Sequence, residues 1–288
     1  MLTERTPARV DGGHLLRLSA HLTDRDRRIL SLIHTHRVLT APQITQVAFT
    51  SHSRAVQRMR ILTGLGLVAR FRPRRDRGSA PWHYVLDTAG AHVVAAEGGR
   101  TADRASVRRD RQLALARSTH LDHRVGANGF FTALVAAGRA SEGSAELGEW
   151  LNASDAHGWA EFHTRDGLIP VPRPDGFGRW DADGGSVVFF LEWDTGSESH
   201  RQLRTKMQRY VDFAPTLVGP MPWVLFVFPT VRRETHARSA LRRVQGAEYA
   251  PVATAHLPEA HHPENAVWWP LRSAAGRVLL SELPEVVV

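Results

Sequence analysis

The pattern of apolar and charged residues changes near the middle of the chain. Up to residue 64 the apolar positions recur with helical spacing, and beyond residue 145 they fall mainly into strand-like runs. Residues 1–140 contain 23 arginines and 10 acidic residues, whereas residues 141–288 contain 13 arginines, one lysine and 19 acidic residues. A chain of 288 residues can bury two cores. We therefore predict an N-terminal domain over residues 18–98, a linker over 99–111 and a second domain over 112–288.

This charge distribution predicts different partners for the two halves. A cationic half suits a nucleic-acid backbone, and an acidic half is compatible with a site that holds a divalent cation. The chain has no cysteine, which excludes disulfides and thiolate metal sites. The first residues lack the apolar core of a signal peptide, and no apolar run is long enough to span a bilayer. We expect a cytoplasmic protein.

The first half contains signals for three short helices. Thr23 precedes a segment with acidic residues in its first turn, and Thr40 opens a Thr-x-x-Gln capping box with a proline at the helix start. A third helix follows Ser51 or Ser53 and ends at Gly64 and Gly66. Three short helices with tight connections predict a helix-turn-helix core.

A β-hairpin is predicted after these helices. Residues 68–72 and 82–86 form its strands, an arginine-rich turn joins them, and Thr88 opens a further helix to Glu97. This order resembles the winged-helix family over residues 20–98. The resemblance implies that the third helix enters the major groove and that the hairpin arginines contact phosphates or the minor groove, although a winged helix can also serve protein contacts. The implied DNA-contacting residues are Arg54, Gln57, Arg58, Arg70, Arg72, Arg74, Arg75 and Arg77.

The second half has the alternating elements of an α/β (α+β) domain with a mixed sheet. Residues 112–137 predict a long helix or a broken pair, and helices are expected near 198–213 and 234–245. Strands are predicted over Ala145–Leu151, Trp159–His163, Leu168–Val171, Val187–Trp193 and Trp223–Phe228.

Acidic residues converge at one end of a predicted hairpin. If residues 182–185 form its loop, the register places Asp175 opposite Glu192, and period-two alternation puts Asp194 on the same face as Glu192. Facing carboxylates repel, so this arrangement favours a bound cation. After the hairpin, Glu198, Gln202, Lys206 and Tyr210 recur every four residues and form a stripe on a helix. Lys206 is the only lysine among 37 basic residues, which indicates a site where arginine cannot replace it.

These motifs resemble the PD-(D/E)XK nuclease superfamily. The matching segments are Pro174-Asp175 and Glu192-Trp193-Asp194, and Asp194 stands where the usual lysine would be, with Lys206 as a migrated substitute. The order of a winged helix, a helix with His123 and Asn128, and then these motifs further resembles the replication-relaxation family and the MobC class of plasmid relaxases. The resemblance implies DNA processing in the transfer or replication of a plasmid or integrative element.

The resemblance also implies a metal-dependent DNA endonuclease. Asp175, Glu192 and the Trp193 carbonyl would hold Mg²⁺ or Mn²⁺, and Lys206 would stabilise charge on the phosphate or position water. Asp194 or Gln202 would complete the site. His123 and Glu149 are weaker candidates.

Two alternatives remain open. A tyrosine relaxase would use a covalent step, for which Tyr210 is the tyrosine nearest the predicted site. None of the close histidine pairs fits its His-hydrophobe-His metal site, because His34 and His36 flank a threonine within a predicted helix, His120 and His123 have the wrong spacing, and His261 and His262 lie in a proline-rich loop. The other alternative is a non-enzymatic DNA-binding regulator with a degenerate nuclease fold. Such a protein could form a homodimer through its tryptophan-rich strands, which contain Trp193, Trp223, Trp268 and Trp269.

Overall fold

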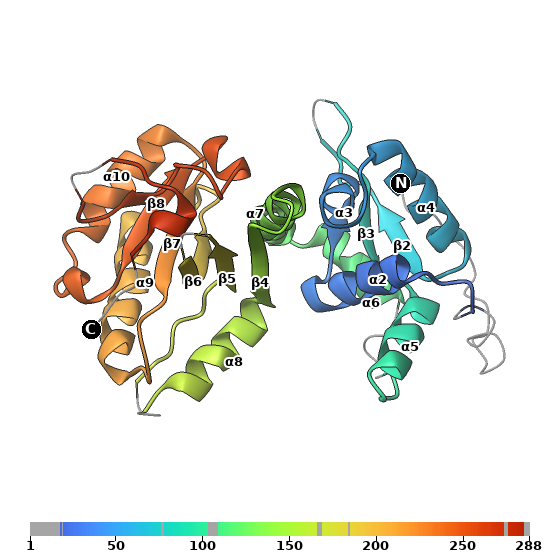
Figure 1. The fold of residues 1–288 in the computed structure, drawn as a ribbon, viewed down its shortest axis with the longest axis horizontal. Coiled ribbons are helices and arrows are strands. Elements are labelled where there is room, and N and C mark those ends of the chain that lie inside the picture. Colours follow the sequence, from blue (N-terminus) through green and yellow to red (C-terminus); the bar gives the residue numbers. More distant parts are fainter. Residues whose placement is uncertain are drawn as a thin grey trace. The chain divides into compact units, whose positions relative to one another are not determined.

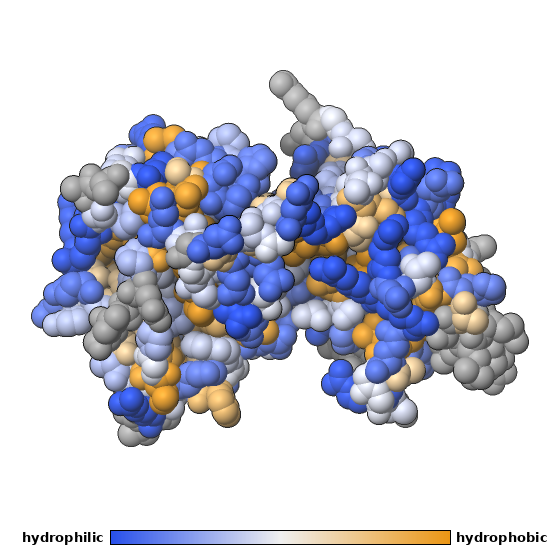
Figure 2. Space-filling view, in the orientation of Figure 1, coloured by the Kyte–Doolittle hydropathy of each residue, from blue (hydrophilic) through white to orange (hydrophobic). Residues whose placement is uncertain are grey.

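The computed structural model describes residues 18, 20–75, 78–102, 109–165, 169–183, 185–273 and 276–284. The chain divides into two compact units, Met1–Asn128 and Gly129–Val288 (Figure 1). The helical segment over residues 112–128 is thereby counted with the first unit. None of the described helices combines the length and the hydrophobicity that a membrane span requires. On the face that Figure 2 shows, hydrophilic side chains cover most of the surface and hydrophobic ones gather only in small groups.

The first unit begins with helices whose starts follow the predicted capping signals. Thr23 caps the first of them, Thr40 caps the second, and both caps are complete capping boxes. Ser51 precedes the third, but its side chain makes no capping bond. The helices are α2 (Asp24–His36), α3 (Ala41–Ala48), α4 (His52–Gly64) and, after the hairpin, α5 (Thr88–Glu97).

A small antiparallel sheet completes the first unit. Its strands are β1 (Leu39–Thr40), β2 (Val68–Phe71) and β3 (His83–Leu86), in the spatial order β1-β3-β2. The predicted hairpin is confirmed by the pairing of β2 with β3. Behind this sheet lie α6 (Arg109–Leu113), the 3-10 helix η1 (Ala114–Arg117) and the start of α7 (Leu121–Ala140), so the predicted long helix is broken.

The start of α7 is bound to the first unit by side-chain amides. Gln43 Nε2 donates to the Val125 carbonyl at 2.7 Å, and Asn128 Nδ2 donates to the carbonyls of His36 at 3.2 Å and Val38 at 2.8 Å. Asn128 thus satisfies carbonyl groups at the C-terminal end of α2, where a helix leaves its last carbonyls unpaired.

Gly90 permits close contact between α5 and the chain before β2. A Cβ atom at Gly90 would lie 2.0 Å from the backbone oxygen of Leu67, whereas a Cβ atom at Gly64 of α4 would meet nothing within 4 Å. We expect Gly90→Ala to destabilise the first unit by about 2 kcal/mol or more, because backbone atoms must shift. Gly64→Ala is the matched control and is expected to be neutral or stabilising by up to about 1 kcal/mol. Native-state hydrogen exchange of α5 and β2 measures the difference, and equal protection in the two variants would contradict this packing.

His36, at the end of α2, makes the stability of the first unit dependent on pH. It is 2% exposed, and burial lowers its pKa from 6.5 to about 3. Between these values the unfolded chain binds a proton that the folded chain does not, so the free energy of unfolding falls as pH decreases. We expect a loss of about 2 kcal/mol from pH 7 to pH 5. Hydrogen exchange of α2 at the two pH values should show this loss in the wild type and in the exposed control His52→Gln, and a smaller loss in His36→Gln, where the buried His83, whose pKa burial also lowers, still contributes.

The second unit is built on a mixed sheet of the predicted kind. Its spatial order is β4-β5-β6-β7-β8-β9; β6, β7 and β8 are parallel, and the remaining neighbours pair antiparallel. The strands are β4 (Ala145–Asn152), β5 (Gly176–Ala182), β6 (Gly185–Trp193), β7 (Trp223–Phe228), β8 (Val252–His256) and β9 (Trp269–Pro270).

Helices cover both faces of this sheet. One face carries Phe190 and Phe226 and packs against α8 (Ala153–His163), α9 (His200–Phe213) and α10 (Val231–Leu241). On the other face Phe189 contacts Phe130 and Phe131 in the second half of α7. Because side chains alternate along β6, Phe190 and Glu192 lie on the face that packs against α9, and Phe189 and Leu191 lie on the opposite face.

Two strand predictions are wrong. Residues 159–163 belong to helix α8, because the Asn152 side chain caps that helix by accepting the N–H groups of Ser154 and Asp155. The predicted strand Leu168–Val171 begins outside the described residues, and residues 169–171 are not in a strand. Strand β8 was not predicted.

Candidate functional site

The hairpin of β5 and β6 has the predicted register. Asp181 lies opposite Ser186, and the pairing continues to Gly176 opposite Leu191, so that Asp175 and Glu192 come directly after the last pair, at the same end of the hairpin. The backbone N–H of Asp175 donates to the Leu191 carbonyl at 2.8 Å. Asp175 Oδ2 accepts the backbone N–H of Trp193 at 2.8 Å. These bonds fix the two acidic residues at the same end of the hairpin.

Helix α9 places the single lysine against this end. Ser199 and Gln202 form a capping box, from which Lys206 and Tyr210 follow at four-residue intervals on one side of the helix. Lys206 Nζ lies 2.9 Å from Glu192 Oε2 and 2.7 Å from Glu198 Oε1. The Tyr210 hydroxyl donates to Glu192 Oε1 at 2.5 Å. Both oxygens of Glu192 are therefore bound by groups from α9.

Burial and charge shift the acid–base properties of this group. Glu192 is 2% exposed, and burial raises its pKa to about 7, although the Lys206 ammonium opposes this shift. Burial acts to lower the pKa of Lys206, but the charges of Glu192 and Asp175 outweigh it and raise that pKa above its ordinary value. Burial also raises the pKa of the Tyr210 phenol, and Glu192 adds to the effect. Lys206 stays charged and Tyr210 stays protonated at neutral pH.

Asp194 and Gln202, two members of the predicted site, have other partners. Asp194 Oδ2 pairs with Arg233 Nε at 2.7 Å, and Asp194 Oδ1 accepts the N–H of Gly196 at 2.7 Å. Arg233 also donates to the Glu198 carbonyl, so this ion pair joins the start of α10 to the loop before α9. The Gln202 side-chain oxygen accepts the backbone N–H of Ser199 at 2.7 Å. The structure thus brings together Asp175, Glu192 and Lys206.

Carboxylates in this group are too few for an all-protein metal cage. Within the described residues no cluster of three or more histidine or acidic side chains could hold a metal ion. Asp175 and Glu192 form a pair, and Mg²⁺ commonly uses one or two carboxylates together with water and substrate phosphate. A cation at this pair would require Lys206 or Tyr210 to release an oxygen of Glu192, because both oxygens are bound.

The weaker candidates lie elsewhere. His123 is on α7 in the segment counted with the first unit. Glu149 is on β4 opposite Arg179, three residues before the pairing of Asn152 with Gly176. Of the interface tryptophans suggested by the sequence, Trp193, Trp223 and Trp268 are buried within the chain.

The predicted DNA-contacting residues of α4 line one groove in the first unit. Arg54 and Gln57 are exposed there, and Arg58 Nε donates to Asp26 Oδ1 at 2.8 Å. A second bond from Arg58 reaches Asp26 Oδ2. Burial acts to raise the pKa of Asp26, but the bonds from Arg58 and Thr23 hold it below its ordinary value. The groove has a volume of about 560 Å³ and also contacts Arg25 and Phe49.

The hairpin arginines are organised around one tryptophan. The guanidinium carbons of Arg70 and Arg72 lie 4.1 and 4.2 Å from the ring centroid of Trp82, which is cation–π distance. Arg74 and Arg75 are exposed, and Arg77 lies outside the described residues.

The family model for replication-relaxation matches residues 30–218. The chain therefore belongs to the replication-relaxation family. No curated protein matches it. The matched range includes α3, α4 and the arginine-bearing hairpin as well as Asp175, Glu192 and Lys206.

Sequence reasoning missed Arg233 and the second contact of Lys206. Glu198 was on the predicted helical stripe, so its spacing could have indicated that contact. No signal in the sequence links Arg233 to Asp194, because they lie 39 residues apart and meet only through the parallel pairing of β6 with β7.

Proposed function

We propose that this protein binds duplex DNA at an origin-like site through its first unit and cleaves a phosphodiester bond with its second. Family membership supports a role in the replication or transfer of a plasmid or integrative element. The observation that carries the cleavage proposal is the grouping of Asp175, Glu192 and Lys206 at one end of the β5–β6 hairpin. Two acids and a lysine in this arrangement are the side chains that a nuclease of the PD-(D/E)XK type would use.

The first unit would act as a winged helix. Its order of helix, strand, two helices and hairpin supports this reading. Arg54 and Gln57 on α4 would contact base edges in the major groove. Arg58, which is bound to Asp26, would contribute mainly by fixing α4 against α2. The hairpin arginines Arg70, Arg72, Arg74, Arg75 and Arg77 would contact phosphates.

The second unit would act with a divalent cation. Asp175 and Glu192, with the Trp193 carbonyl, would hold Mg²⁺ or Mn²⁺. When bound, such an ion polarises a phosphate and makes water a stronger acid. Lys206 would place its charge beside the phosphate, because Glu192 and Glu198 orient its ammonium group. Tyr210 would stay protonated and position Glu192, so water would be the nucleophile.

A nicking assay tests this proposal. Supercoiled plasmid carrying a candidate origin is incubated with the protein and Mg²⁺ or Mn²⁺, and the open-circle form is quantified. We expect nicking by the wild type and its loss with EDTA. We also expect Lys206→Ala to lose nicking and to keep DNA affinity. DNA binding by the wild type without nicking in either metal would overturn the cleavage proposal.

A non-enzymatic DNA-binding regulator is the second candidate function. It is favoured by the closed network in which Lys206 and Tyr210 occupy both oxygens of Glu192. In a regulator this network would only stabilise the fold. The two candidates differ in the nicking assay, because a regulator binds the same DNA and leaves it supercoiled.

A further inference from the structure

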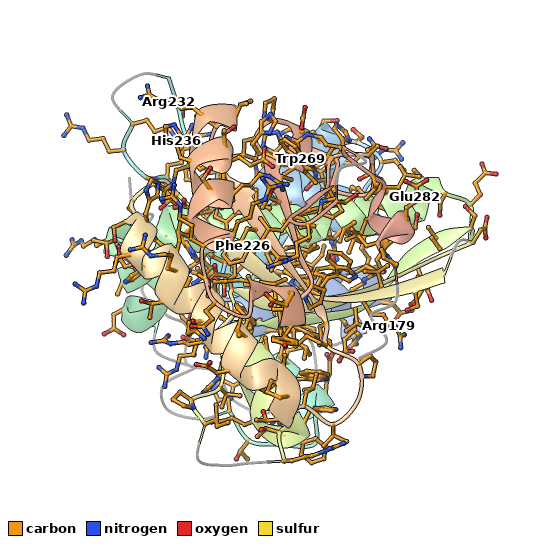
Figure 3. All side chains as sticks on the ribbon, turned by 90° about the vertical axis from the view of Figure 1, so that its left-hand side faces the viewer. Arg179, Phe226, Arg232, His236, Trp269 and Glu282 are labelled. Carbon is orange, nitrogen blue, oxygen red and sulfur yellow. The ribbon has the colours of Figure 1, made fainter. Side chains whose placement is uncertain are left out.

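Basic residues are concentrated in one part of the otherwise acidic second half. Residues 193–245 contain nine basic and four acidic residues, whereas the rest of residues 141–288 contains five basic and fifteen acidic residues. The basic segment contains α9 and α10, which contact each other. Figure 3 shows the two helices on the side of the second unit that faces the viewer, with Arg232 and His236 labelled on α10.

The acidic residues of this segment point mainly inwards. Asp194 and Glu234 are buried and bind Arg233 and Arg277, and Glu198 binds Lys206. The remaining acid, Asp212, is exposed and accepts a bond from Gln208 at 2.8 Å. The outer surface of the two helices therefore has a large excess of positive charge.

The charges of the outer arginines are not neutralised by acidic side chains of the described residues, although Arg242 Nε donates to the Leu271 carbonyl at 2.9 Å. Exposed arginines on or directly after the two helices are Arg201, Arg204, Arg209, Arg232, Arg242 and Arg243. None of these six forms an ion pair with an acidic residue in the described ranges. The exposed residues of α9 and α10 include no Phe, Tyr or Trp, and Val231 is their one large hydrophobic side chain. Such a surface suits a line of phosphates, because it offers charge with His200 and His236 as its only exposed rings and no apolar patch for a protein.

The two helices are also held rigidly. The Ser199 capping box fixes the start of α9, and Arg233 joins α10 to Asp194 and to the Glu198 carbonyl. A prearranged charged surface loses little conformational freedom on binding.

We infer that the outer surface of α9 and α10 binds the backbone of duplex DNA without sequence specificity, as a second DNA contact besides the first unit. The inference rests on the proposed DNA-binding function of the chain, but it does not require cleavage. Lys206 faces Glu192 from the same helix, so this surface would hold DNA on the element that carries the candidate catalytic lysine.

The test is the salt dependence of DNA affinity in the full chain. A labelled duplex of random sequence is titrated by fluorescence anisotropy in EDTA, where no metal-dependent cleavage occurs. The test variant combines Arg201→Ala, Arg204→Ala and Arg232→Ala. We expect its affinity near physiological salt to fall by about 10-fold or more, and the slope of log K against log salt to decrease by about 2 to 3, because each lost phosphate contact removes about 0.9.

A matched variant removes the same charge from other exposed positions of the second unit. It combines Arg165→Ala, Arg179→Ala and Arg272→Ala, which all lie outside α9 and α10. This variant should keep the wild-type slope. The inference would be overturned if the test variant had the wild-type slope, or if its affinity fell no further than that of the matched variant. If the test variant bound DNA as the wild type does but bound phosphatidylserine vesicles less tightly, the inference would be overturned in favour of a membrane surface. If the wild type binds DNA without nicking it, the cleavage proposal fails but this inference stands. The failure of one is therefore distinguishable from the failure of the other.

Discussion

Asp175→Asn is expected to reduce metal-dependent nicking by about 100-fold or more while the fold is kept. Asparagine retains an oxygen that can accept the Trp193 N–H, as Asp175 Oδ2 does at 2.8 Å, so the end of the hairpin should stay in place. The substitution removes the negative charge that would attract the cation. A metal-held phosphate provides several kcal/mol of charge stabilisation, which corresponds to at least this change in rate.

Asp181→Asn is the matched control for this variant. Asp181 lies in strand β5, which begins directly after Asp175, six residues further along the chain, and it binds Ser186 at 2.6 Å and Arg179 at 3.0 Å. It makes the same change in charge at a distance from Glu192, so nicking should remain within about twofold of the wild type. Nicking by Asp175→Asn at the wild-type rate would exclude Asp175 as a metal ligand. An equal loss in both variants would indicate a general effect of charge.

Glu234→Ala is expected to lower the free energy of unfolding of the second unit by about 3–5 kcal/mol. The Glu234 side chain is 2% exposed and accepts bonds from Thr254 at 2.6 Å and from Arg277 at 2.7 Å. Its Oε2 also lies 2.8 Å from His256 Nδ1. Removal of the carboxylate leaves the Arg277 guanidinium partly buried without its main counter-charge, and it removes the bonds that link Glu234 of α10 to Thr254 and His256 of β8.

Tryptophan fluorescence during urea denaturation measures this effect, because seven of the eight tryptophans lie in the second unit. Glu248→Ala is the control. Glu248 pairs with Arg272 at 2.9 Å, but both side chains are at least half exposed, and such surface pairs contribute about 1 kcal/mol or less. If the two variants were equally stable, the buried network would not hold α10 on the sheet.

The pKa of Glu234 gives the same network a defined pH dependence. Burial acts to raise this pKa, but the bonds from Arg277 and Thr254 outweigh it and hold the pKa below its ordinary value. A carboxylate with a lowered folded pKa contributes stability above its unfolded pKa and loses it as pH falls through the folded value. The difference between wild type and Glu234→Ala should therefore be largest at neutral pH and shrink in acid.

Local signals predicted most of the first unit and the hairpin. Thr23 and Thr40 mark helix starts because a capping box joins residues only three positions apart, so that it can be read from the local sequence. Both capping boxes are present in the structure. The register of β5 and β6 was predictable because alternating side chains and a short loop fix the pairing. The prediction failed at residues 159–163, where a short apolar segment suits a strand or a helix and the deciding cap, Asn152, lies seven residues earlier.

Partners distant in the sequence could not be predicted. Alternation indicates the face on which Asp194 lies, but not that Arg233 binds it rather than a metal ion. Lys206 could be placed near Glu192 because it lies on a helix that follows the hairpin, with four-residue spacing from Glu198 and Tyr210. The Glu234 network joins α10, β8 and Arg277, which come together only when the parallel strands pair.

The grouping of Asp175, Glu192 and Lys206 as a metal-dependent site is tested most directly by anomalous scattering from crystals soaked in Mn²⁺. We predict a manganese peak within bonding distance of the Asp175 and Glu192 carboxylates in the wild type, and no such peak in Asp175→Asn. A wild-type map at saturating Mn²⁺ with no peak at these carboxylates, or with Lys206 and Tyr210 still binding both oxygens of Glu192, would contradict the account.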